Sequence, residues 1–441
     1  MSHLVQSSET SVFPRFLDLG YANVERGVGL RLYTTDGREL LDACSGGAMT
    51  ACLGHGVREL VDAAAQQAEH ATYVYNHHFS NDRQEEYADR LLSTAAPEMA
   101  RVRFASGGSE ANEAAVRLAR SYHVERGDER RRIMVSAAES YHGATFGALG
   151  LTGRRSLQEP YGDYLPDHRH IPAGDLAALD RLLEEYGEEV AAFFCEPISA
   201  ASRAAWSPPP EFWEGLAERR ERHGFLVVFD EIVTGMGRTG SWFAYQDMPL
   251  VPDIVTAGKG MGGGAFPLSA ALVREEVYEA FAQGSREFEH GHTWDGAPLS
   301  CAVGLATLAY IESHGLIERV NERGPSLRDE AEAALRDLDM VGEVRGRGYL
   351  VGIELVDPRD AASPLPADVN AAELVDDTAL DHGLLITSGH AAADGYAGDQ
   401  VLLAPAFTAT DAELGEMIEK LAATLAEVDR RVKERLSGAA A

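Results

Sequence analysis

The sequence has few lysines and few cysteines. Of its 39 basic residues only Lys259, Lys420 and Lys433 are lysines, and the other 36 are arginines. The four cysteines form no CxxC pair and no metal-ligand spacing, so we expect neither a disulfide scaffold nor a metal site. No apolar run approaches the length of a membrane span, and the first ten residues lack the pattern of a signal peptide. We therefore expect a cytoplasmic protein.

Basic residues are also scarce relative to acidic ones. The chain carries 70 acidic residues and a formal net charge of −31. This charge disfavours nucleic acids and anionic membrane surfaces as partners. A solvated acidic surface explains it more simply than an acidic interaction patch.

The 441 residues, 45% of them apolar, predict two packed lobes. Short apolar runs alternate with helical patterns and predict strands at 101–105, 133–137, 190–195, 225–229, 253–257 and 268–272. Such strands indicate an α/β fold with a mostly parallel sheet covered by helices on both faces. We assign this large lobe to 61–320. A smaller α+β lobe takes 1–60 and 321–441, with strands expected within 24–43 and at 346–356, 383–387 and 400–404, and helices near 325–338, 370–381 and 411–437.

Five of these apolar runs end in residues suited to chemistry. They are followed in turn by Ser106-Gly107-Gly108-Ser109 opening a helix, by Tyr141-His142, by Glu196, by Asp230 and by Gly258-Lys259. Each has a plain alternative when taken alone, such as a serine helix cap or a packing tyrosine. Because ligands bind at the carboxyl ends of parallel strands, their placement together indicates one binding site.

Lys259 is the informative member of this set, because no other lysine occurs before residue 420. Arginine can neither lose its proton nor form an imine, whereas lysine can do both. Pyridoxal phosphate has an aldehyde that condenses with a lysine, a ring nitrogen that needs a carboxylate, a phosphate that suits a helix N-terminus, and a ring that needs a stacking partner. Lys259, Asp230, Gly108 with Ser109, and Tyr141 could supply these four groups.

A competing motif is GMGRTG at 235–240, which matches GxGxxG. A dinucleotide-binding protein would place those glycines directly after a strand and at the start of a helix. Here Asp230 and Glu231 intervene, and the sequence SWFAYQDMP that follows does not read as a helix. We therefore keep nucleotide binding only as a weak alternative.

The motifs resemble those of the class III (omega-amino acid type) aminotransferases, which are fold type I pyridoxal-phosphate enzymes. The resemblance runs from about residue 25 to 430. It rests on SGGSEANEAAVRLAR at 106–120, SYHG at 140–143, CEP at 195–197, FDEIVTGMGRTG at 229–240, AGKGMGGG at 257–264, HTWDGAPLSCA at 292–302 and RGRGYLVGIEL at 345–355. It implies transfer of an amino group from a primary amine or omega-amino acid to an oxo acid, pyruvate or 2-oxoglutarate, by a ping-pong mechanism.

The resemblance also implies roles around the cofactor ring. Lys259 bonds covalently to the cofactor, and Asp230 pairs with the ring nitrogen. Ile232 packs on one face of the ring. Tyr141 packs on the other face, with His142 beside it.

A second set of roles concerns the phosphate and the substrate. Gly108 and Ser109 bind the phosphate together with Thr293 of a second subunit. Glu196 lies near the ring oxygen or the substrate. Family members are homodimers with the site at the interface, so we expect a homodimer or a larger homo-oligomer.

The sequence departs from the family where a substrate carboxylate is often bound. The stretch 388–406 contains no arginine, and Arg203 is only a weak substitute. The amino donor is then a simple amine, or another residue binds the carboxylate. A decarboxylase or aminomutase of the same fold remains an alternative. A regulator that binds the cofactor without turnover is a third possibility, but the charge of −31 and the lack of a recognisable DNA-binding segment argue against it.

Overall fold

The computed structural model describes residues 4–6, 10–165, 167–389 and 398–438. Its largest sheet has seven strands in the order β6, β12, β11, β10, β9, β7, β8. Neighbouring strands are parallel except at β12, which is antiparallel to β11 and β6. A mostly parallel sheet is therefore confirmed. The strand bounds are β6 Met99–Ala105, β7 Ile133–Ala137, β8 His168–Ile171, β9 Val190–Cys195, β10 Leu226–Asp230, β11 Ile254–Ala257 and β12 Ser269–Arg274.

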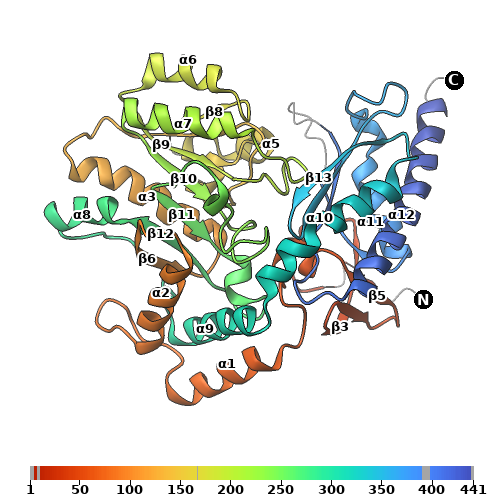
Figure 1. Ribbon diagram of the computed structural model, residues 1–441, viewed down its shortest axis with the longest axis horizontal. Helices are drawn as coiled ribbons and strands as arrows, with labels where there is room; N and C mark the ends of the chain where they lie inside the picture. The colour runs from red at the N-terminus through yellow and green to blue at the C-terminus, as the bar shows by residue number, and fades with distance from the viewer. Residues whose placement is uncertain (1–3, 7–9, 166, 390–397, 439–441) are drawn as a thin grey trace.

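Helices bury both faces of this sheet (Figure 1). On one face α3 and α8 share a hydrophobic core with Phe194 and Val228. On the other face α2, α6, α7 and α9 share a core with Phe193 and Val227, and α1 packs against α9. Adjacent residues of one strand thus serve opposite cores, which is why the strands read as continuous apolar runs. The helix bounds are α1 Arg58–His70, α2 Asp82–Thr94, α3 Gly108–Glu125, α4 Phe146–Leu151, α5 Arg155–Gln158, α6 Leu176–Tyr186, α7 Pro210–His223, α8 Glu275–Gln283 and α9 Pro298–Ser313.

Local capping signals set several helix boundaries. The Asn81 side chain accepts from the amide of Gln84 at 2.9 Å at the start of α2. The Asp175 side chain accepts from the amide of Ala178 at 2.8 Å at the start of α6. Helix α7 ends at Gly224, whose φ of 72° lies in the left-handed region that favours glycine.

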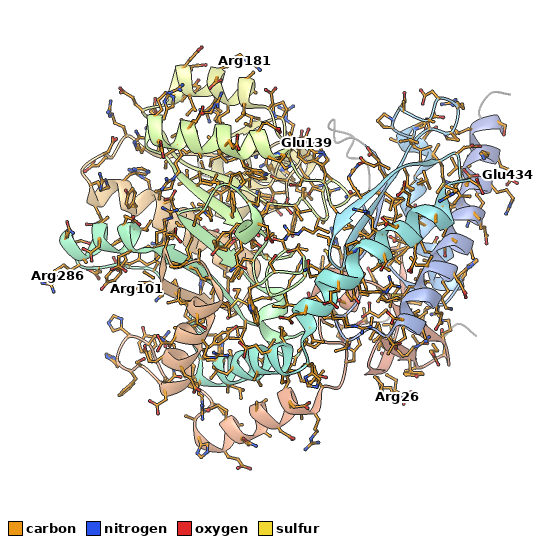
Figure 2. The ribbon with its side chains drawn as sticks, in the orientation of Figure 1. Arg26, Arg101, Glu139, Arg181, Arg286 and Glu434 are labelled. Atoms are coloured by element: carbon orange, nitrogen blue, oxygen red, sulfur yellow. The ribbon has the colours of Figure 1, made fainter. Side chains whose placement is uncertain are left out.

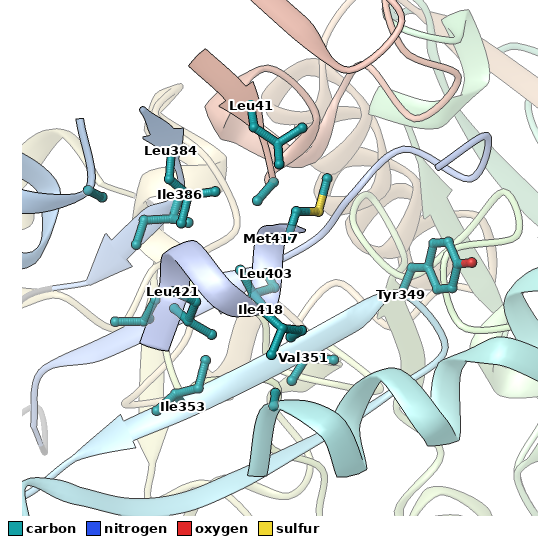
Figure 3. Packing of buried hydrophobic residues seen from close by; sticks show 14 of the residues in the cluster. Leu41, Tyr349, Val351, Ile353, Leu384, Ile386, Leu403, Met417, Ile418 and Leu421 are labelled. Carbon is teal, nitrogen blue, oxygen red and sulfur yellow. The ribbon is translucent and has the colours of Figure 1, made fainter. Parts of the chain in front are cut away.

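Two four-stranded sheets form the second part of the molecule, in the orders β15-β5-β4-β3 and β13-β14-β17-β16. Strand β5 pairs in parallel with β15, with Leu41 opposite Leu384. Figure 3 shows Leu41 beside Leu384 and Met417 in one core. This pairing supports our proposal that 1–60 and 321–441 form one lobe and 61–320 the other. The bounds are β3 Val24–Val28, β4 Arg31–Thr34, β5 Glu39–Asp42, α10 Leu316–Leu335, β13 Val341–Arg347, β14 Leu350–Leu355, α11 Ala371–Asp381, β15 Leu384–Leu385, β16 Thr387–Gly389, β17 Gln400–Leu403 and α12 Asp411–Gly438, and a separate pair joins β1 Leu4–Gln6 to β2 Gly20–Ala22.

Two predicted elements need correction. The strand expected at 346–356 is a hairpin of β13 and β14, and the chain turns at Gly348, which has a φ of 58°. The helix expected near 325–338 begins at Leu316 and contains Pro325 in its interior. A proline inside a helix removes a backbone hydrogen bond, so a helix that continues through Pro325 is not what the sequence pattern favours.

Charged side chains cover the outside of the molecule. Figure 2 shows Arg26, Arg181, Arg286 and Glu434 at its periphery, and all four are exposed. Within the ranges that the structure describes, no helix is long and apolar enough to cross a membrane.

Candidate functional site

Lys259 follows the carboxyl end of β11 and begins a short 3-10 helix, Lys259–Gly262. Its φ of 41° lies in the left-handed region, which costs a non-glycine residue conformational energy. The side chain is partly buried, and its ammonium group forms no hydrogen bond or ion pair with another described residue. Burial lowers the pKa of Lys259, although the charge of Asp230 acts to raise it.

Asp230 ends the neighbouring parallel strand, β10, and its carboxylate is held from three sides. Oδ1 accepts from the backbone amide of Ile232 at 3.0 Å. Oδ2 accepts from Asn112 Nδ2 at 2.7 Å and contacts His142 Nδ1 at 2.8 Å. Asn112 is itself fixed, because its Oδ1 accepts from the Thr256 hydroxyl at 2.8 Å. The carboxylate therefore has a single orientation at the edge of the sheet.

His142 is buried between two carboxylates. Burial alone would lower the pKa of His142, but its hydrogen bond to Asp230 and the charges of Asp230 and Glu196 raise it overall. Its other ring nitrogen, Nε2, is buried and has no hydrogen-bond partner among the described residues. Both facts indicate that the His142 imidazole interacts mainly with Asp230.

Glu196 follows the carboxyl end of β9 and is partly buried. Burial raises the pKa of Glu196 to about 7, and the charge of Asp230 adds to this effect, whereas that of His142 opposes it. The Ser199 hydroxyl donates to Glu196 Oε2 at 3.2 Å. This carboxyl group therefore changes charge near neutral pH.

The start of α3 offers an anion site. The Glu110 carboxylate accepts from the amides of Ser106 and Gly107, at 2.9 and 3.2 Å. The amides of Gly108 and Ser109 lie in the first turn of α3, where no carbonyl four residues earlier belongs to the helix. A Cβ added at Gly107 would have no atom within 4 Å, so open space lies over this turn. Helix N-termini of this kind bind phosphate.

Two close approaches connect this turn to the other site residues. A Cβ at Gly108 would lie 3.0 Å from Ile232 Cγ2, and one at Gly258 would lie 3.0 Å from Ile232 Cδ1. The Ser109 hydroxyl accepts from the amide of Ala144 at 3.1 Å, and a Cβ at Gly143 would lie 2.5 Å from that hydroxyl oxygen. Ile232 thus lies between the phosphate turn and the lysine segment, and Ser109 lies against the loop that carries His142.

Tyr141 and Thr293 differ from the rest because they are exposed. Tyr141 is 43% exposed. Thr293 lies in the segment between α8 and α9, and among the described residues no hydrogen bond joins it to another predicted site residue. One chain therefore brings together the predicted site residues other than Thr293.

Sequence reasoning missed two buried residues near the site. Asn112 was one, although a lone asparagine among alanines on an apolar helix face is a usable signal. The other is Arg238, inside the GMGRTG motif, which is buried and donates to the carbonyls of Tyr349 and Pro405 at 3.1 and 2.5 Å. The motif is followed by the 3-10 helix Ala244–Asp247 and no α-helix before β11, so it lacks the helix that a dinucleotide site needs.

Arg203, the substitute considered for carboxylate binding, lies with its guanidinium 4.0 Å from the centre of the Trp206 ring. It pairs with no carboxylate in the part of the chain that the structure describes. The arginine-free stretch 388–406 falls partly outside the described residues, at 390–397.

Proteins similar to this chain in sequence and in fold include aminotransferases. The family model "Aminotransferase class-III" matches residues 17–425. The uncharacterized aminotransferase YodT of Bacillus subtilis is 34% identical over 95% of this chain and 98% of its own length. A taurine–pyruvate aminotransferase of Bilophila wadsworthia is 30% identical over 92% of each chain. An amine transaminase from an uncultivated Pseudomonas species, solved in its PLP-bound form, superposes with a TM-score of 0.85 at 29% identity over 95% of this chain and 97% of its own.

These likenesses cover nearly the whole chain and confirm the predicted fold type I architecture. They also agree with the family that the motifs indicated. The chain belongs to the class III aminotransferases.

Proposed function

We propose that the enzyme uses pyridoxal phosphate to move an amino group from a primary amine or omega-amino acid to an oxo acid, pyruvate or 2-oxoglutarate. The observation that carries the proposal is the position of Lys259 and Asp230 at the carboxyl ends of the adjacent parallel strands β11 and β10. An amine with a lowered pKa and a fixed carboxylate are the two groups that this cofactor requires.

The remaining residues fit the cofactor as well. The first turn of α3 has amides and open space for the phosphate. Ile232, which lies against Gly108 and Gly258, and the exposed ring of Tyr141 would offer apolar surfaces to a flat ring. The amine of Lys259 would be the nucleophile for the aldehyde of the cofactor.

The chain's own groups divide the chemistry between them. When bound, the cofactor takes up the amino group and draws electrons from the substrate carbon into its ring. Asp230 holds a proton at the ring nitrogen, and His142 and Asn112 keep the Asp230 carboxylate in place. Lys259 would move a proton between the substrate carbon and the cofactor carbon that carries the amino group, within each half of the cycle. The lowered pKa of Lys259 supports this role, because a larger fraction of the amine is neutral at a given pH.

We propose that simple amines and omega-amino acids are the donors. The support is the lack of arginine in 388–406, together with the taurine–pyruvate and amine transaminases among the similar proteins. A donor with an alpha-carboxylate would need a cation at this place, and Arg203 is the candidate to test for that role.

We further propose a homodimer in which Thr293 serves the phosphate site of the neighbouring subunit. Thr293 is exposed, and Trp294 beside it is 54% exposed and packs edge-on against Tyr73 at 5.2 Å. A large exposed aromatic side chain such as that of Trp294 is typical of an interface. Free and buried cysteines support the cytoplasmic location that we also propose.

A screen of amino donors against pyruvate and 2-oxoglutarate tests the proposed function. We expect a carbonyl product from an amine or omega-amino acid, with alanine or glutamate formed in equal amount. Release of carbon dioxide without an amino acceptor would instead identify a decarboxylase, and isomerisation without an oxo acid would identify an aminomutase. The Lys259→Ala variant is the control and should form no product.

A further inference from the structure

Polar side chains hold the loop that carries Thr293 against the rest of the chain. We define the Thr293 loop as 290–296, between α8 and α9. Arg103, on β6, donates to Asp295 Oδ2 at 3.0 Å and to the carbonyl of His290. The backbone amide of His292 donates to the same carboxylate oxygen at 2.8 Å. Asp295 is 3% exposed, so its carboxylate is the buried centre of the loop.

Further contacts leave the loop one conformation. The Asn76 side-chain amide donates to the carbonyl of Asp295, and that of Asn81 donates to the carbonyl of Gly296 at 3.0 Å. A Cβ at Gly291 would overlap the end of the Arg103 side chain, so the loop backbone passes close against this guanidinium. The tip, in contrast, is exposed at Thr293 and Trp294.

Several polar atoms in and beneath the Thr293 loop are buried without a hydrogen-bond partner. Eleven buried side-chain nitrogen and oxygen atoms of the described residues lack a hydrogen-bond partner, and five of them lie in or under this loop. The five are Asn76 Oδ1, Arg103 Nε, His290 Nε2, His292 Nδ1 and Asp295 Oδ1. Two of these atoms, His292 Nδ1 and Asp295 Oδ1, face each other at 3.6 Å. A buried polar group without a hydrogen bond opposes folding, so the loop is held at some cost in stability.

We propose that Asp295, held by Arg103, is the positioning residue that fixes the Thr293 loop so that the Thr293 hydroxyl meets the phosphate bound in the neighbouring subunit. This inference rests on the proposed function. Arg103 also lies on the strand that ends at Ala105 and leads into the phosphate turn of α3. The same strand therefore supports the chain's own phosphate site and the loop that serves its neighbour.

Cofactor affinity separates this role from a general structural one. The dissociation constants of pyridoxal phosphate and of pyridoxal, which lacks the phosphate, are measured on the full-length, cofactor-free dimer. Thr293→Ala should raise that of pyridoxal phosphate about tenfold or more, the loss expected for one hydrogen bond to a charged group. Asp295→Ala should raise the dissociation constant of pyridoxal phosphate by the same factor, and combining it with Thr293→Ala should raise this constant no further. The constant of Asp295→Asn should lie between those of wild type and Asp295→Ala. Pyridoxal should bind all of them alike.

Arg103→Met and Arg101→Met form a matched pair two residues apart on one strand. Arg101 is exposed and pairs with Glu275 at 3.3 Å, away from the loop. Only Arg103→Met should weaken binding of pyridoxal phosphate.

Two outcomes would overturn the positioning role of Asp295. They are wild-type affinity for pyridoxal phosphate in Asp295→Ala and Asp295→Asn, and an equal loss of affinity for pyridoxal. Neither outcome would contradict the role of Thr293. An unchanged affinity in Thr293→Ala would instead overturn the cross-subunit role itself. If Asp295→Ala does not sediment as a dimer, Asp295→Asn gives the deciding comparison.

Discussion

His142 Nδ1 lies 2.8 Å from Asp230 Oδ2, and both side chains are buried. The same oxygen accepts from Asn112, whereas Oδ1 accepts only from the Ile232 amide among the described residues. A carboxylate oxygen can accept more than one hydrogen bond. Oδ1 is therefore the atom of Asp230 with room for the protonated ring nitrogen of a cofactor.

Asp230→Asn should retain cofactor but lose turnover. An amide cannot hold a positive charge at the ring nitrogen, so the ring no longer accepts electrons from the substrate carbon. We expect the rate of the half-reaction with amine to fall roughly 10²- to 10⁴-fold. Stopped-flow absorbance of the loaded variant measures this rate, and cofactor content provides the control. Near-normal turnover would refute the role.

The raised pKa of Glu196 makes stability depend on pH in a defined direction. The folded pKa is about 7, whereas an unfolded glutamate has a pKa of about 4.3. Between these values the folded state binds more protons than the unfolded state, so the contribution of Glu196 to stability is lost as the pH rises. From pH 5.5 to 8 this loss amounts to about 2 kcal/mol.

Glu196→Gln cannot ionise and should not show this loss. Urea unfolding of cofactor-free protein at both pH values measures it: the stability of the variant relative to wild type should rise by about 2 kcal/mol from pH 5.5 to pH 8. The exposed Glu214→Gln on α7 is the matched control and should track the wild type. Parallel pH dependences of wild type and Glu196→Gln would show that the pKa is not raised.

Gly143→Ala should weaken cofactor binding through Ser109. Gly143 has a φ of 132°, and an added Cβ would lie 2.5 Å from the Ser109 hydroxyl oxygen. Gly127 also has a positive φ, 77°, but a Cβ there meets no atom within 4 Å. Both substitutions should cost about 1 kcal/mol or more of stability. Only Gly143→Ala should raise the dissociation constant of pyridoxal phosphate, by about tenfold for a displaced hydrogen-bonding group. Equal affinity in the two variants would remove Ser109 from the phosphate site.

The large sheet was predictable because its strands are buried on both faces. Runs such as that of β9 are apolar throughout, and the two faces of a covered sheet require this. Strand β8, with the sequence His-Arg-His-Ile, lies at the edge of the sheet and carries no such signal. Helix α9 has no polar face from which helical periodicity could be detected, since it packs against α1, α2 and the core.

The site was predictable where chemistry limits the choice of residue. Lys259 follows the end of one strand and Asp230 ends another. A lysine or an aspartate is seldom needed at such a position for structure alone. The support of Asp230 by Asn112 and Thr256 was not predictable, because it depends on which face of α3 meets β11. The anchor of Asp295 on Arg103 joins residues 192 positions apart and needs the folded chain to be seen.

Subunit exchange tests whether Thr293 acts across an interface. Thr293→Ala is mixed with Lys259→Ala, and the subunits are allowed to exchange. If Thr293 serves its neighbour, one site of each hybrid has a native lysine and a native threonine, and activity should rise above that of the Thr293→Ala dimer. If Thr293 acts in its own chain, every hybrid site has one defect. No rise after verified exchange would then rule out the cross-subunit role.

The most direct test of the account is the identity of the lysine that bonds to the cofactor. Native enzyme is reduced with borohydride, digested and mapped by mass spectrometry. The two competing lysines lie on α12, where Lys420 donates to the carbonyl of His382 at 2.7 Å and Lys433 pairs with Asp339 and Asp429 at 2.7 and 2.8 Å. The account predicts cofactor on Lys259 alone, and loss of both label and transamination in Lys259→Ala. Label on Lys420 or Lys433 with Lys259 unmodified would contradict it.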